Sequence, residues 1–137
     1  MAYKIFIGML MFSLQAAFAE PFPLTIIEPF DEGKIVMYVA ESDIEQSPAW
    51  LPGEGAPPLS IENLIKAIEK YRAGMPRLAE DTVHEIALKP IWHHEKQHRW
   101  YYLVQMKSAE GHGHRHYLAV LMSGKIISAI KEPEAYK

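Results

Sequence analysis

Residues 98–130 read HRWYYLVQMKSAEGHGHRHYLAVLMSGKIISAI, and this stretch decides the fold. Apolar and aromatic residues alternate with other residues on both sides of its glycine- and histidine-rich middle. Runs with this period of two are typical of half-buried β-strands. A turn in the middle places Met106 opposite His116 and Val104 opposite Leu118, which gathers one apolar row on one face of a hairpin.

The segment before this hairpin predicts a helix. Residues 61–73 carry apolar side chains at helical spacing, with Ser60 placed to cap the first turn and Gly74 placed to end the last. Residues 83–92 predict a strand before the hairpin, and residues 126–130 predict one after it. A helix and a sheet that each have one apolar face both bury it when they pack together. We therefore expect an α+β fold in which one amphipathic helix packs on an antiparallel sheet of three to five strands.

An extended N-terminal arm or hairpin precedes the helix. Residues 24–27 and 34–41 predict two strands, whereas residues 42–58 contain four prolines and two glycines and predict a long loop. The sheet face that carries Tyr101 and Leu103 points away from the helix. Either the arm covers this face, or the face is an exposed apolar patch and a partner site.

The first 19 residues have the pattern of a secretory signal peptide. Lys4 precedes an apolar run, and Ala17-Phe18-Ala19 is a small-x-small cleavage pattern. The run of ten residues is too short for a helix across a bilayer core of ~30 Å, so we expect no stable membrane insertion after cleavage. The predicted parts are a signal peptide at 1–19 and one secreted or periplasmic domain at 20–137, in which the arm and Pro-rich loop occupy 20–58 and the helix and meander occupy 59–131.

Composition narrows the classes of function. The chain has 137 residues, 49% of them hydrophobic, which favours a packed core over disorder. Its formal net charge is −3, and no basic stripe is apparent, so we expect no nucleic-acid partner. It has no cysteine, which excludes disulfides and thiolate metal ligands.

Residues 60–130 resemble a PepSY-type domain, a small secreted or periplasmic module with one helix followed by a three-stranded antiparallel meander. The helix at 61–73, the aromatic strand at 100–104 and the turn Gly124-Lys125-Ile126-Ile127 carry the resemblance. The acidic residue common shortly before the Gly-Lys turn is replaced here by Leu-Met-Ser at 121–123. The resemblance implies a non-enzymatic binding or inhibitory module with an unidentified protein partner, and it supplies no catalytic residues.

Histidine is the one unusual residue type. All seven histidines lie between His84 and His116, and residues 112–116 form an H-x-H-x-H run whose side chains share one side when extended. If Ile86 pairs with Val104, a histidine on each neighbouring strand flanks the central methionine. Imidazole and thioether ligands suit copper, and imidazole suits zinc. This alternative function is a periplasmic copper- or zinc-binding protein with the candidate ligands His84, Met106, His112, His114 and His116.

Two further alternatives stay open. The first is that the GHGHRH segment is only a solvated loop and His116 a half-buried strand residue, because the chain lacks a tighter metal pattern such as H-E-x-x-H. His93, His94 and His98 lie on the order of 30 Å away at the other end of the central strand, so they cannot share a metal with this loop. The second and more remote alternative is a hydrolase. The chain has three aspartates for a Ser–His–Asp arrangement, but no G-x-S-x-G and no H-E-x-x-H pattern.

Overall fold

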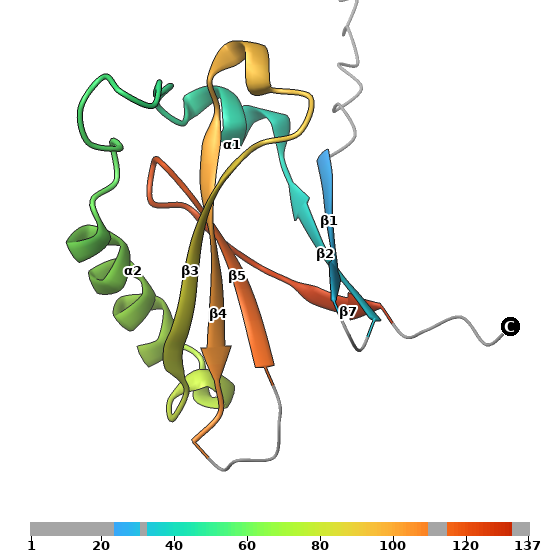
Figure 1. Ribbon diagram of the computed structural model, residues 1–137. Coiled ribbons are helices and arrows are strands. Elements are labelled where there is room, and N and C mark those ends of the chain that lie inside the picture. Colours follow the sequence, from blue (N-terminus) through green and yellow to red (C-terminus); the bar gives the residue numbers. More distant parts are fainter. Residues whose placement is uncertain (1–23, 31–32, 110–114, 133–137) are drawn as a thin grey trace, which may run out of the picture.

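The computed structural model describes residues 24–30, 33–109 and 115–132, which form two antiparallel sheets and one main helix (Figure 1). The larger sheet has the order β3-β4-β5-β6, from β3 (Thr82–Pro90), β4 (Trp100–Lys107), β5 (Arg115–Leu121) and β6 (Ile126–Ser128). The smaller sheet has the order β1-β2-β7, from β1 (Leu24–Phe30), β2 (Gly33–Val39) and β7 (Ile130–Glu132). The predicted α+β class is confirmed.

Helix α2 (Ile61–Ala73) begins and ends where the sequence predicts. The Ser60 hydroxyl accepts a hydrogen bond of 3.1 Å from the Asn63 backbone N–H, and Gly74 follows the last turn. Leu64 and Ile68 are buried against one face of the larger sheet. They pack in a core with the large apolar side chains of the two central strands, namely Tyr102, Val104, Met106, Leu118 and Val120.

The central hairpin has the predicted register. Met106 pairs with His116 and Val104 pairs with Leu118. The turn after β5 depends on Gly124, whose φ of +90° lies in the region that side chains with a Cβ rarely adopt. These pairings direct the apolar row of β4 and β5 towards α2, as expected.

The N-terminal arm is a hairpin, and it covers the other face of the larger sheet. Strands β1 and β2 and the short helix α1 (Glu41–Gln46) bury Tyr101 in a second core with Ile26, Met37, Val39, Ile44, Ala119 and Leu121. The described part of the chain therefore has three layers, with the larger sheet between α2 and the smaller sheet (Figure 1). Of the two alternatives for the face of Tyr101 and Leu103, the structure shows the first, in which the arm covers it.

Two predictions about local structure are wrong. The predicted loop at 42–58 begins inside a helix, because α1 buries Ile44 completely on the second core. The predicted strand 126–130 is divided between the sheets, because the chain leaves β6 after Ser128 and continues as β7 beside β2. Lys131 pairs with Ile35 there.

Two short 3-10 helices, η1 (Pro76–Leu78) and η2 (Glu95–Gln97), complete the described elements. Within the described ranges, no helix is both long and apolar enough to cross a membrane. The predicted signal peptide at 1–19 lies outside these ranges.

Candidate functional site

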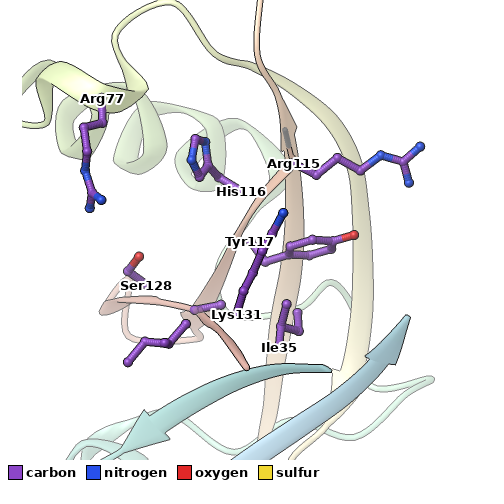
Figure 2. Close-up of a pocket in the computed structure, with 9 residues that line it drawn as sticks. Ile35, Arg77, Arg115, His116, Tyr117, Ser128 and Lys131 are labelled. Carbon is purple, nitrogen blue, oxygen red and sulfur yellow. The ribbon is translucent and has the colours of Figure 1, made fainter. Parts of the chain in front are cut away.

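A pocket of about 370 Å³ lies where the chain passes from the larger sheet to the smaller one (Figure 2). Helix η1 contributes Arg77, and β5 contributes Arg115, His116 and Tyr117. The crossing segment and the smaller sheet contribute the remaining side chains, namely Ile35, Ser128, Ala129, Ile130 and Lys131. We refer to these nine residues as the basic pocket.

The pocket exists because β6 is short. Its three residues pair only with Leu118 to Val120 of β5. One more hydrogen bond, of 3.0 Å, runs from the Ala129 N–H to the Tyr117 carbonyl, and the chain then turns towards β2. Among the described residues, no strand continues beside the first residues of β5, and the pocket occupies this space.

Basic side chains lie on both sides of β5. His116 shares its face with Leu118 and points towards the layer of α2, on the same side as Arg77 (Figure 2). Arg115 and Tyr117 lie on the other side of the strand, because neighbouring residues of a strand point to opposite faces. The positive groups of the pocket therefore flank the edge of β5 from both faces.

The cations differ in their partners. Arg77 and Lys131 are exposed, and neither has an ion pair or side-chain hydrogen bond to another described residue. Arg115 is held by Gln105 when the Gln105 amide is oriented so that its nitrogen donates to Glu85. In this orientation the amide oxygen accepts at 3.0 Å from Arg115 Nη1 and at 3.1 Å from Nε. Two unpaired charges on an acidic chain make this pocket a site where an anion is favoured.

His116 has a buried acidic partner. Its Nδ1 bonds to the carboxylate of Asp81, whose side chain is only 3% exposed, and the Arg72 guanidinium donates to the Asp81 carbonyl oxygen. This pairing fixes the imidazole ring and leaves Nε2 as its second polar atom. Ser128 lines the same pocket, but no hydrogen bond joins its hydroxyl to His116. Asp81 and His116 are therefore connected, whereas Ser128, the third group of a Ser–His–Asp arrangement, lines the pocket without a hydrogen bond to His116.

The predicted metal ligands are not brought together as expected. Ile86 does pair with Val104, but a β-bulge between Val83 and Glu85 displaces His84. Val83 pairs with Met106 instead, and His84 is exposed. The prediction that His84 and His116 flank Met106 is therefore wrong. The cause is one extra residue on β3.

Met106 itself is fully buried in the core beneath α2. His112 and His114 lie outside the described residues. Within the described ranges, no three side chains of histidine, aspartate or glutamate are grouped so that they could hold a metal ion. The structure thus retains one predicted ligand, His116, at the pocket, and it adds Asp81, which the sequence did not indicate.

The second histidine group has a structural position. His94 is buried, with its Nδ1 2.6 Å from Gln97 Oε1 and its Nε2 3.2 Å from Glu41 Oε2. These contacts attach the loop between β3 and β4 to α1. His93 and His98 both have left-handed backbone, with φ of 67° and 56°, which fits a tight connection between two strands. These contacts and backbone angles give the described histidines at this end of the sheet a structural role.

Most of the pocket is not predicted by the sequence. Its cations come from η1, β5 and β7, and no local pattern connects these three segments. The residues that carry the PepSY resemblance lie in α2, in β4, in the turn before β6 and at the start of β6, and none of them lines the pocket. Comparison of the chain with protein-family models, with curated proteins and with solved structures gives no significant match.

Proposed function

We propose that this chain is a secreted or periplasmic binding module, similar to PepSY domains and without catalytic activity, that holds an anionic group of a protein partner in the basic pocket. One observation carries the proposal: Arg77 and Lys131 line one pocket of an acidic chain, and neither has an ion pair with another residue that the structure describes. Charges of one sign in a concave site concentrate the opposite charge there.

The pocket favours carboxylates of a protein over a nucleic acid. Its volume of about 370 Å³ is at the small end of the range for ligand sites and accepts a few side chains. A nucleic-acid interface needs a basic stripe along a phosphate backbone, and a chain of net charge −3 repels a long polyanion. A short acidic segment avoids that repulsion.

A labelled acidic peptide tests the proposal. The probe is an acetylated and amidated octapeptide with two adjacent glutamates among threonines and valines, and its binding is followed by fluorescence anisotropy. Arg77→Ala and Lys131→Ala should each weaken binding roughly three- to tenfold, the range for a partly exposed charge-assisted contact. Added salt should weaken binding as well, because it screens exposed charges.

Lys70→Ala is the matched control, since Lys70 is an exposed cation on α2 that does not line the pocket. It should bind the probe like the parent protein. Equal affinity of all four proteins, or no binding at any salt concentration, would exclude the pocket as an anion site.

The proposed location has its own test. If the signal peptide is removed as its pattern predicts, mass spectrometry of exported protein should find Glu20 as the first residue. An intact Met1 on membrane-bound protein would contradict secretion.

A second candidate, copper or zinc binding, is favoured by the Asp81 carboxylate on His116. A carboxylate on one ring nitrogen commonly orients a histidine whose other nitrogen holds a metal. Isothermal titration should then find one ion per chain, lost on acidification because imidazoles are protonated. Bound metal should also raise the thermal stability.

Variants at the two ends of the sheet separate metal binding from a solvated loop. His114→Ala and His116→Ala should each weaken binding strongly, whereas His93→Ala and His94→Ala should change it little. A metal affinity weaker than about 10 µM would leave the loop without a metal site. So would equal losses of affinity from the variants at the two ends of the sheet.

A further inference from the structure

The backbone of β5 has a free edge inside the basic pocket. In an antiparallel pair the N–H and C=O of one residue point to the same side, and alternate residues share that side. The Tyr117 carbonyl accepts from Ala129, so Tyr117 points towards β6, and Arg115 two residues earlier points the same way. No described strand reaches Arg115 on this side. Among the described residues, the N–H and C=O of Arg115 therefore have no strand to pair with on this side.

The charges around this edge have the spacing that an added strand requires. Successive side chains of a strand point to opposite faces. A strand beside β5 would direct one side chain to the face of Arg77 and His116, and the next to the opposite face, where Lys131 of the smaller sheet lines the pocket (Figure 2). Two adjacent acidic residues would therefore each meet a cation.

We propose that an extended acidic segment of a protein partner pairs with the free edge of β5, along the path that β6 would follow if it continued past Ser128. The inference rests on the proposed function and adds to it the form of the ligand. Main-chain hydrogen bonds to Arg115 hold the segment, and the cations on both faces select adjacent carboxylates. The exposed Ile130 adds an apolar contact beside them.

Methylation of the peptide backbone tests the strand pairing. The probe is the octapeptide described above, compared with the same peptide carrying N-methyl groups on both glutamates. The charges are identical, but the methylated peptide lacks the N–H donors that a paired strand uses. We expect the methylated peptide to bind at least tenfold more weakly.

A pair of protein variants tests the same contact from the other side. Arg115→Ala and Arg115→Pro both lack the guanidinium, but only proline also lacks the backbone N–H. Because that N–H points away from β4, proline is tolerated at this edge position. Arg115→Pro should unfold at the same temperature as Arg115→Ala. It should bind the unmethylated probe at least tenfold more weakly than Arg115→Ala does.

The possible results separate the two proposals. Equal binding of the two peptides, with weaker binding in Arg77→Ala, would overturn strand pairing and leave anion binding in the pocket intact. No binding of either peptide to the parent protein would overturn both. If Arg115→Pro fails to fold, the comparison of the two peptides decides alone.

Discussion

Tyr101 joins the two sheets through a buried hydroxyl group. Its phenol lies in the second core and donates to Glu28 Oε1 at 2.9 Å, while Lys89 donates to Glu28 Oε2 at 2.8 Å. Burial first, and then the hydrogen bond and the negative charge of Glu28, raise the pKa of Tyr101 well above its ordinary value. The residue therefore stays neutral in the folded protein under conditions that ionise an exposed tyrosine.

This shift predicts a loss of stability in alkali. The unfolded chain ionises Tyr101 near pH ~10, whereas the folded chain resists ionisation. The contribution of the neutral phenol is complete below about pH 10 and decreases as the pH rises further, because proton release then favours the unfolded state. Urea unfolding at a series of pH values measures this decrease.

Tyr101→Phe is the informative variant. At neutral pH it should lower the free energy of unfolding by about 1 kcal/mol, because one hydrogen bond to Glu28 is lost while the ring remains. Above about pH 10 its stability should decrease less steeply than that of the parent protein, since this phenol no longer titrates. If the stability of the two proteins changed in parallel with pH, Tyr101 would ionise equally in the folded and the unfolded state.

Helix α2 is attached by its apolar side. Ile68 is 1% exposed in the core shared with β4 and β5, whereas Ile61 on the same helix is 53% exposed. Ile68→Ala should cost about 2–5 kcal/mol of unfolding free energy, as large truncations in a packed core do. Ile61→Ala is the matched control and should stay within about 0.5 kcal/mol. Chemical unfolding that gave equal losses would mean that the helix does not pack as described.

The elements differ in how far the sequence predicts them. Helix α2 is predicted to the residue because Ser60 and Gly74 mark both ends, and the register of β4 with β5 is fixed by alternation. Helix α1 is missed because it buries a single residue, Ile44, and has no side-chain cap. Its formation depends on tertiary packing, which a local pattern does not contain.

The candidate site is less predictable than the fold. A β-bulge at His84 changes the side of the sheet to which one residue points. No turn-forming residue in the sequence indicates this bulge. The contact of Asp81 with His116 joins residues 35 positions apart. The pocket depends on where the chain leaves β6. The apolar run continues from Ile126 through Ile130, so the sequence does not indicate that β6 ends at Ser128. Long-range geometry, which alternation does not encode, places the basic groups together.

At the scale of the whole molecule, β7 connects the C-terminal part of the described chain to the N-terminal hairpin. A chain ending at Ala129 loses the pairing of Ile130 and Lys131 with β2. The amide of Met37 should then exchange hydrogen faster, while that of Val104, in the core beneath α2, should change less. Lys131→Ala keeps the backbone and should preserve the protection of Met37. Equal protection in both chains would mean that β7 contributes nothing to the smaller sheet.

Because the strand order is β1-β2-β7, the smaller sheet cannot be completed until late in synthesis. Val36 pairs with Ile130, more than ninety residues later, so β2 leaves the ribosome long before its second neighbour exists. At ordinary translation rates this interval is roughly 5 to 20 seconds. Throughout it, a nascent hairpin would offer an unpaired strand edge to other nascent chains.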